Sequence, residues 1–240
     1  MHRQTWGVAL GLACLLGPGP KAWAAGGHYA VDDAVILEPE ACQVEFWIDK
    51  AADGRGTLLH AGPACRVGPV ELGLNLDYFH AGGSGTFTAG GLQLKWAREL
   101  LPGLSAGIAL VAAVRDHEPN FIGTSVVLPL TWQANESLRV HVNAGRDFVR
   151  GAANLSRSGA AVEWDASANW SLVAERFREV GLDFWRAGIR CAPHPDLSID
   201  LSRAEGMAGA PNRWAFGLSF AFSRQRGLGR VNTNCHQPAG

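Results

Sequence analysis

The sequence predicts an all-β fold: a closed antiparallel up-and-down β-barrel of about 12 strands that spans a membrane. Three observations lead to this prediction. Period-two alternation recurs in successive segments, long and short connections alternate between these segments, and the first residues form an export signal. The last segment, "WAFGLSFAF", shows the alternation clearly, because one face carries large apolar side chains and the other only Ala, Gly and Ser.

The N-terminus has the three parts of a secretory signal peptide. Arg3 supplies a positive charge, residues 6–16 form an apolar stretch, and "AWA" at 22–24 is a small-x-small cleavage site. The apolar stretch is shorter than the roughly 20 residues that a membrane-spanning helix needs. We therefore expect residues 1–24 to be a signal peptide; a lipoprotein signal at Cys14 is the alternative.

The charge of the mature chain argues against a nucleic acid partner. Removal of Arg3 and Lys21 with the signal leaves 19 basic residues against 22 acidic ones. Binding to nucleic acid phosphates would need a clustered excess of Lys and Arg. The mature sequence also contains no stretch long and apolar enough for a membrane-spanning helix, so we expect a barrel in the bacterial cell outer membrane, with membrane lipid and the barrel-assembly machinery as partners.

Each alternating segment has about the length that crosses a bilayer as a tilted strand. The predicted strands are residues 42–49, 57–65, 68–79, 86–98, 104–115, 121–133, 137–147, 158–168, 170–178, 182–192, 195–203 and 212–222. The barrel is therefore expected over residues 42–222. Residues 25–41 are a periplasmic leader or a small plug, and residues 223–240 form a periplasmic C-terminal tail.

Long connections alternate with short ones along the chain. Most odd-numbered connections are open, for example "HAGGSG" and "FVRGAANLSR", whereas most even-numbered ones are tight, for example "ANE" at 134–136. An exception is "ELLPG" at 99–103. Outer-membrane barrels have short periplasmic turns and longer outer loops, so the odd-numbered connections are predicted to lie outside the cell.

The two faces of the segments differ in chemistry. In residues 68–79, Leu72 and Leu74 share one face, and Glu71 and Asp77 share the other. A soluble sandwich or a secreted barrel with an apolar core shows the same period and is the alternative. The nine Trp and ten Phe, against two Tyr, supply aromatic side chains for membrane interfaces and favour lipid as the solvent of the apolar face.

The opposite face carries charges of both signs, which must be paired or hydrated inside a barrel. The candidate lumen-lining residues are Glu71, Asp77, Lys95, Arg115, Arg139, His141, Glu163, Asp165, Arg186, Arg190, Asp200 and Arg213. A barrel of this size is wider than one that side chains alone can fill. The lumen is therefore either a narrow aqueous path or a region closed by salt bridges.

The residues "GLSFAF" resemble the C-terminal assembly signal of bacterial outer-membrane barrels, with Gly217, Phe220 and Phe222 at its key positions. The resemblance implies recognition by the barrel-assembly machinery. Two departures are Ala215, at a place where a polar residue is common, and the 18 residues that follow the signal. A weaker resemblance, over "LPLTWQANESLRVHVNAG" at 128–145, is to transporter-like barrels of the MetA-pathway (phenol degradation) family, although a shared fold does not carry function.

The four cysteines of the mature chain can be paired from the predicted topology. A hairpin centred near Gly54 places Cys42 opposite Cys65, at the periplasmic end of the first two strands. Cys191 ends the tenth strand on the same side, where Cys235 lies in the tail. We therefore expect Cys42–Cys65 and Cys191–Cys235 disulfides; a redox or metal role is the alternative, but no Cys-x-x-Cys is present.

The sequence predicts no catalytic residue, no metal site and no cofactor. The eight His lack metal-ligand spacing, and no nucleophile elbow or phosphate loop occurs. His60, His80 and His117 are expected to be solvated near the outer end, and His141 to join an interior network. The expected function is a narrow channel or transport protein for a small solute; the alternatives are a structural or surface-interaction barrel with a closed lumen, and a lipid-modifying enzyme.

Overall fold

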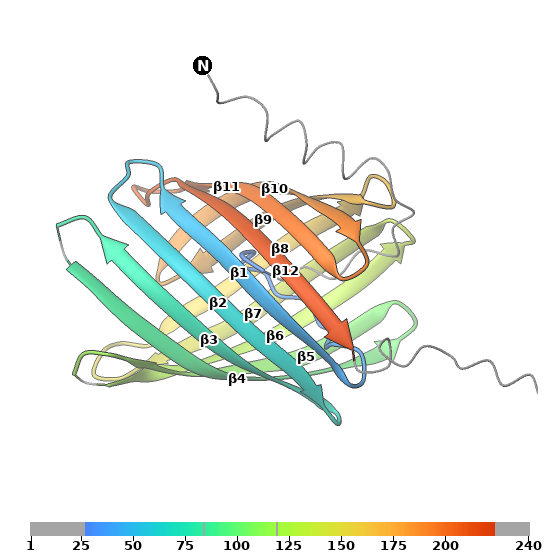
Figure 1. Ribbon diagram of the computed structural model, residues 1–240, viewed down its shortest axis with the longest axis horizontal. Coiled ribbons are helices and arrows are strands. Elements are labelled where there is room, and N and C mark those ends of the chain that lie inside the picture. Colours follow the sequence, from blue (N-terminus) through green and yellow to red (C-terminus); the bar gives the residue numbers. More distant parts are fainter. Residues whose placement is uncertain (1–26, 84, 119, 224–240) are drawn as a thin grey trace, which may run out of the picture.

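The computed structural model describes residues 27–83, 85–118 and 120–223, which form a closed barrel of twelve antiparallel strands (Figure 1). Each strand pairs with its neighbours in the sequence, and the first pairs with the last. The strands are β1 (Ala41–Ala51), β2 (Gly56–Val67), β3 (Val70–Ala81), β4 (Gly85–Leu101), β5 (Leu104–Arg115), β6 (Phe121–Asn135), β7 (Leu138–Val149), β8 (Leu155–Asp165), β9 (Trp170–Glu179), β10 (Leu182–His194), β11 (Leu197–Gly206) and β12 (Arg213–Ser223). The predicted fold class and strand number are confirmed.

Pairing of β1 with β12 closes the barrel and leaves no free sheet edge. The register runs from Ala41 opposite Ser223 to Ala51 opposite Arg213, so β1 is paired along its whole length. The segment "WAFGLSFAF" thus forms the closing strand. Its Phe220 and Phe222 point outwards and are about half exposed, whereas Gly217 faces the lumen.

Four predicted strand boundaries are wrong by three residues: the ends at residues 98, 168 and 203 and the start at residue 158, where the structure has Leu101, Asp165, Gly206 and Leu155. β4 continues to Leu101, so "ELLPG" is no open connection but a tight turn at residues 102–103, where Gly103 adopts a positive φ of 77°. β8 begins at Leu155 and not at residue 158, because the inward side chain of Arg157 forms ion pairs with β7 and β9 and extends the sheet.

The corrected boundaries keep the alternation of long and short connections. One end of the barrel has residues 52–55, 82–84, 116–120, 150–154, 180–181 and 207–212, and the other end has 68–69, 102–103, 136–137, 166–169 and 195–196. We call these the long-loop end and the short-turn end. Most connections of the first set are longer, as the sequence indicates.

The outer surface of the barrel is apolar over most strands. Large apolar side chains at alternate positions are exposed, including Leu72, Leu74 and Leu76 on β3 and the aromatic residues of β12. The inward positions between them, such as Glu71 and Asp77, are buried or half-buried. The chemistry of the two faces therefore agrees with the predicted alternation. No helix in the described residues is long and apolar enough to cross a membrane.

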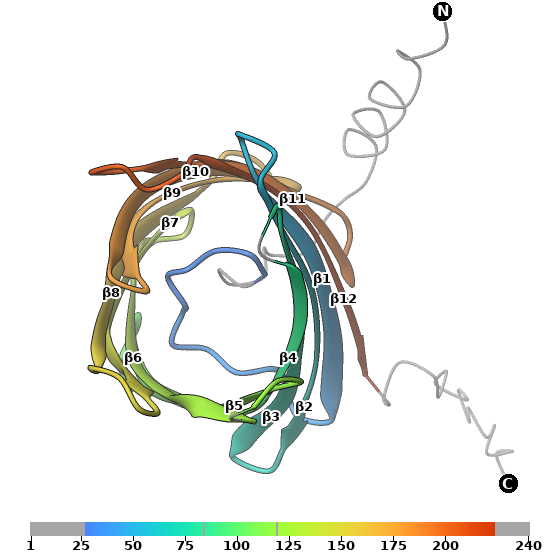
Figure 2. The same ribbon diagram turned by 90° about the vertical axis from the view of Figure 1, so that its left-hand side faces the viewer.

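The segment 27–40, which we call the N-terminal segment, runs through the inside of the barrel before β1 (Figure 2). Val31 is fully buried against Ala161, Phe177 and Phe184 of the wall. Gly159 makes this approach possible, because a Cβ there would lie 2.5 Å from Val31 Cγ2. A second buried cluster joins Leu37 of the segment to Ala41 on β1 and Ala64 on β2, so the apolar core lies between the segment and two parts of the wall.

The structure contains the first predicted disulfide. Cys42 on β1 and Cys65 on β2 are registered with each other and form a disulfide with a Cα–Cα distance of 4.0 Å. Cys191 is buried on β10, and its predicted partner Cys235 lies outside the described residues. The Cys191–Cys235 pairing therefore stays a prediction.

Candidate functional site in the lumen

A cavity of about 1090 Å³ lies between the N-terminal segment and the inner wall of the barrel. Most of its wall comes from inward side chains of β1–β6, among them Trp47, Asn75 and Gln93. The N-terminal segment forms the opposite side. Because this segment packs against β8–β10, the space that it leaves open lies beside β1–β6.

The cavity follows the length of the barrel. Phe79 and Val180 line it near the long-loop end, and Glu38 and Asp196 line it near the short-turn end. Its lining residues therefore come from both ends of the strands. This arrangement is what a passage for a small solute requires, since the solute must reach the space from both sides of a membrane.

The charged residues that line the cavity are mostly acidic. Nine are carboxylates: Asp32, Asp33, Glu38, Glu45, Asp49, Glu71, Asp77, Glu179 and Asp196. Five are bases: Lys95, Arg157, Arg186, Arg190 and Arg213. A cleft with low-dielectric walls and one excess sign of charge concentrates counter-ions, so this cavity attracts cations.

Ion pairs hold the bases of the cavity in place. Lys95 Nζ lies 2.8 Å from Asp32 Oδ1 and 2.9 Å from Asp33 Oδ1. Arg186 lies 3.2 Å from Glu175 Oε1 and 3.6 Å from Asp49 Oδ2. The positive charges are thus held beside carboxylates, and a mobile anion would have to compete with these partners.

A second ion-pair network lies near the long-loop end. Arg157 contacts Asp147 at 3.2 Å and Glu179 at 3.1 Å. Arg213 contacts Glu179 at 3.7 Å and Asp49 at 3.7 Å. This network connects β7, β8, β9, β12 and β1 across the inside of the barrel.

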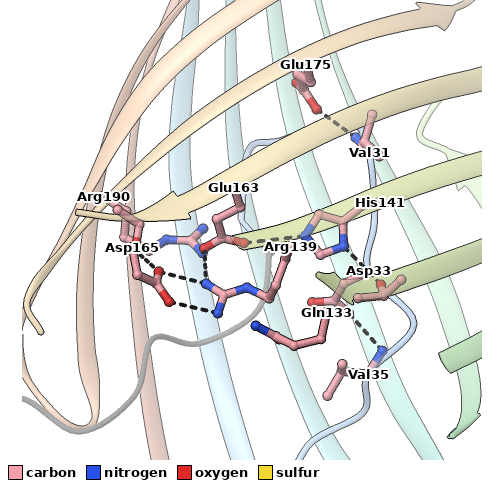
Figure 3. Close-up of polar contacts among 12 residues, drawn as sticks. Val31, Asp33, Val35, Gln133, Arg139, His141, Glu163, Asp165, Glu175 and Arg190 are labelled. Atoms are coloured by element: carbon pink, nitrogen blue, oxygen red, sulfur yellow. Dashed lines mark hydrogen bonds and ion pairs between the residues drawn. The ribbon is translucent and has the colours of Figure 1, made fainter. Parts of the chain in front are cut away.

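A third network fills the lumen beside β7–β11 (Figure 3). Arg139 donates two hydrogen bonds to the carboxylate of Asp165, at 2.8 and 2.9 Å, and lies 3.0 Å from Glu163 Oε1. Arg190 lies 3.6 Å from the same Glu163 oxygen and 2.7 Å from Asp200 Oδ1. Glu163 and Asp200 are fully buried, so this part of the lumen is closed by salt bridges.

His141 links this third network to the N-terminal segment. Its Nε2 lies 3.5 Å from Glu163 Oε2, and its Nδ1 lies 2.9 Å from the hydroxyl of Thr131. The same hydroxyl accepts a hydrogen bond of 2.8 Å from the backbone N–H of Ala34. His141 is therefore an interior hydrogen-bonding residue, consistent with its predicted environment.

The prediction for His60 is wrong, because its side chain is buried and not solvated. The imidazole stacks on Trp47 with ring centroids 3.4 Å apart, and its Nδ1 lies 2.6 Å from Asp77 Oδ1. Trp47, unlike most Trp of the chain, points into the lumen. His80 and His117 are exposed. The stack gives the cavity an aromatic wall beside a carboxylate.

The structure brings most candidate lumen-lining residues into these networks. Arg115 differs: it lies at the end of β5, where its guanidinium donates to the carbonyl of Glu118 in the following connection, 3.2 Å away. Several inward charges are absent from the predicted set: Asp32, Asp33, Glu45, Asp49, Asp147, Arg157, Glu175 and Glu179. Extending the period-two alternation through residues 171–179 would have placed Glu175 and Glu179 on the inner face.

Backbone groups of the N-terminal segment are bound by wall side chains. The carboxylate of Glu175 accepts from the N–H groups of Ala30 and Val31, at 3.2 and 2.9 Å. Glu71 accepts from the N–H of Leu37 at 3.0 Å. These carboxylates do for the irregular segment what a neighbouring strand does in a sheet: they satisfy buried N–H groups.

The start of the segment is held by β10 and β11. His28 Nε2 lies 2.6 Å from the hydroxyl of Ser202, and the guanidinium of Arg186 donates to the His28 carbonyl. Burial, followed by the charges of Arg186 and Arg190, holds the pKa of His28 well below its usual range. Burial also raises the pKa of the Asp33 carboxyl, against the opposing charge of Lys95.

Within the described residues, no group of three or more His, Cys, Asp or Glu side chains could hold a metal ion. The lumen contains an acidic cavity beside the N-terminal segment. The aromatic stack of Trp47 and His60 and the amides of Asn75 and Gln93 add polar and flat surfaces along it.

Comparisons with known proteins identify a family and support the barrel fold. The model of a family described as "Uncharacterised conserved protein UCP029691" matches residues 12–222. Among curated proteins, none matches the sequence.

Similar solved structures are small outer-membrane barrels. The KdgM porin has a TM-score of 0.63 at 8% identity, covering 75% of this chain and 99% of that chain. The NanC porin has a TM-score of 0.57 at 10% identity, covering 74% and 98%. The CymD monoaromatic hydrocarbon channel has a TM-score of 0.50 at 11% identity, covering 78% and 89%. At these identities the likeness establishes the fold alone, and all three are porins or channels.

Proposed function

This chain belongs to the conserved family whose model it matches, and we propose that it forms a narrow channel in the bacterial outer membrane for small cationic or neutral solutes. One observation carries the proposal: the cavity along β1–β6 is lined from end to end and has nine carboxylates against five bases. Rings of carboxylate side chains are the usual means by which a pore favours cations.

The location in the outer membrane is supported by the surface of the barrel. Exposed Leu, Phe and Trp side chains cover its outside, and hydrocarbon is the solvent that suits such a surface. A soluble protein would expose far less contiguous apolar surface. The porins with similar folds are barrels of the same kind.

We infer that the N-terminal segment is a small plug that narrows the channel. Its backbone and side chains are bound by wall residues on opposite sides of the barrel, including Glu71 on β3, Lys95 on β4, Glu175 on β9 and Ser202 on β11. A segment fixed on so many sides reduces the open cross-section. The channel is thereby limited to solutes that fit the remaining space beside β1–β6.

The charge of the lining argues against an acidic saccharide as the solute. A KdgM porin structure contains oligogalacturonate, a chain of carboxylate-bearing sugars. In this chain the excess carboxylates would repel such a ligand, and the bases already have carboxylate partners. A cationic or an uncharged polar or aromatic solute fits the lining better.

Reversal potentials in planar lipid bilayers test the proposal. Under a KCl gradient we expect current carried mainly by K⁺. The double variant Glu45→Gln/Asp77→Asn should move the reversal potential towards that of an unselective pore, because both carboxylates line the cavity. Chloride selectivity of the unchanged protein would contradict the proposal. Arg98→Ala, on the outer surface, is the matched control and should leave the potential unchanged.

A structural barrel with a closed lumen is the second candidate function. It is favoured by one specific observation: Arg139 and Arg190 form ion pairs with the fully buried Glu163, and Arg190 also pairs with the fully buried Asp200, which closes the part of the lumen beside β7–β11. The absence of current from both the complete protein and a variant lacking residues 27–40 would support this candidate over a channel.

A further inference from the structure

The outward face of β7–β11 carries a cluster of arginines in the half of the barrel nearer the long-loop end. The cluster consists of Arg146, Arg176, Arg178 and Arg203. All four are exposed and face outwards, because the residues directly before and after each of them face the lumen. An arginine on the lipid-facing side of a barrel costs about 2–4 kcal/mol at the bilayer midplane and about 0–1 kcal/mol near an interface. Four such residues on one face therefore mark the level of the lipid headgroups.

The strand registers leave open space between these arginines. Arg146 is registered with Ser156, Arg178 with Ser158, and Arg203 with Ala187. The outward side chains among them are small: Ser156, Ser158, Ala160, Ala174 and Ala187. Because these outward side chains are short, they leave a shallow area between the arginines.

Two tryptophans orient the guanidinium groups. Arg176 lies over the ring of Trp185, 5.7 Å from its centroid, and Arg203 lies over the ring of Trp214 at 5.3 Å. These cation–π contacts hold the guanidinium groups against the barrel wall. Tryptophan itself prefers the membrane interface, which agrees with the headgroup level inferred from the arginines.

The cluster has an excess of positive charge. Arg178 pairs with Asp183 at 2.7 Å, and Arg203 with Glu205 at 3.3 Å. Within the part of the chain that the structure describes, Arg146 and Arg176 have no carboxylate at ion-pair distance. Four guanidinium groups thus face two carboxylates, and the excess positive charge favours an anionic ligand.

An apolar groove begins at the edge of the same cluster. Its volume is about 570 Å³, and it includes Arg203 and Trp214 at one side. The remaining wall is formed by Val162, Trp164, Leu172, Val173, Ala174, Ala187, Gly188, Ile189, Leu201 and Ser202. The small side chains of Ala174 and Ala187 form its floor between larger neighbours. An acyl chain matches both the shape and the chemistry of this groove.

From this arrangement we propose that the β7–β11 face binds a phosphorylated glycolipid of the outer leaflet, with its phosphates on the arginine cluster and an acyl chain in the groove. A phosphate monoester carries a charge of about −1.5 to −2, and the arginine fork binds phosphate oxygens in pairs. A ligand with more than one such phosphate matches the excess charge better than a single phosphodiester does. The proposal depends on the proposed outer-membrane location, with the long-loop end outside.

Native mass spectrometry of the detergent-folded barrel tests the proposal. The protein is incubated with equal amounts of lipid A and phosphatidylglycerol, with and without excess inorganic phosphate. We expect lipid A to be retained preferentially, and retention to fall at least tenfold in Arg176→Ala/Arg203→Ala. Arg98→Ala is the matched control, because Arg98 is an exposed arginine on the outward face of β4, near the short-turn end.

Three other outcomes would contradict the proposed glycolipid site. Equal retention of phosphatidylglycerol would show an unselective anionic surface, and displacement by inorganic phosphate would show a simple anion site. Unchanged retention in the double variant would place the lipid elsewhere. Heat-modifiable gel migration, checked for every variant, reports folding. Channel current is a separate measurement, so loss of conductance with retained lipid A would refute the proposed channel and not the lipid site.

Discussion

Lys95 Nζ lies 2.9 Å from Asp33 Oδ1, and this contact joins the N-terminal segment to the barrel wall. Both side chains are buried, with 8% and 5% of their surfaces exposed. They are 62 positions apart in the sequence. A buried ion pair contributes little net stability, but removal of one partner leaves an uncompensated charge and is strongly destabilising. The pair is therefore one of the contacts on which the position of the segment depends, beside those to Glu71 and Glu175.

Replacement Lys95→Met should release the N-terminal segment. The Asp33 carboxylate would then be buried without its cation, which costs about 3–5 kcal/mol. This cost is larger than the free energy that a single hydrogen bond usually contributes. We expect single-channel conductance to rise as the segment leaves the lumen. Deletion of residues 27–40 should give the same conductance. Unchanged conductance in Lys95→Met, with a large increase after the deletion, would show that Lys95 is not required to hold the segment in the lumen.

Replacement Arg139→Ala should destabilise the barrel itself. It removes the two hydrogen bonds to Asp165 and the nearest cation of the fully buried Glu163. We expect a loss of about 3–5 kcal/mol in urea unfolding of the membrane-inserted protein. Arg139→Lys should rescue only part of this loss, because an ammonium cannot form the paired contacts of a guanidinium. The exposed Arg98→Ala should change stability by less than about 0.5 kcal/mol.

Acid pH should weaken the binding of the N-terminal segment through His28. The pKa of His28 is lower in the lumen than the usual value of about 6.5, because of burial and the facing charges of Arg186 and Arg190. His28 therefore takes up a proton more readily when the segment is released than when it is in the lumen. The free energy that holds the segment in the lumen decreases as pH falls below about 6.5, by up to about 1.4 kcal/mol per pH unit.

Conductance at pH 7.5 and 5.5 measures this effect of His28. The raised pKa of Asp33 acts in the opposite direction, since a carboxyl that protonates more easily in the lumen favours the bound segment in acid. The comparison is therefore made with His28→Gln, which keeps a partner for Ser202 but does not titrate. The rise in conductance on acidification should be larger in the unchanged protein than in this variant; an equal rise would exclude His28 as its source.

Reduction should destabilise the hairpin of β1 and β2. The Cys42–Cys65 disulfide closes a loop with a sequence separation of 23, and a loop of this size is worth about 3 kcal/mol. We expect the temperature at which the barrel loses its heat-modifiable form to fall in reductant and in Cys42→Ser/Cys65→Ser. Because the double variant lacks this disulfide, the fall in temperature caused by reductant should be smaller in it than in the unchanged protein. Peptide mapping without reductant should recover Cys42 linked to Cys65 and Cys191 linked to Cys235; Cys42 linked to Cys191 would contradict the strand layout.

The sequence by itself determines the strands, their faces and the hairpin registers. These features depend on neighbouring residues: side chains alternate every second position, and a short hairpin fixes the residues that face each other. For this reason the pairing of Cys42 with Cys65 and the outward orientation of Phe220 and Phe222 were predictable. The errors at Leu101 and Leu155 arose where a strand continued past an apparent turn signal.

Only the tertiary structure decided what occupies the lumen. The contacts of Val31 with Glu175, Asp33 with Lys95 and Leu37 with Glu71 join positions far apart in the sequence. They arise because closure of the barrel brings inward side chains of distant strands within a few ångströms of one another, and because an irregular segment has backbone groups that these side chains can bind. No local period in the sequence encodes such cross-lumen distances. The path of the N-terminal segment, and with it the position of the acidic cavity, therefore depends on the closed barrel as a whole.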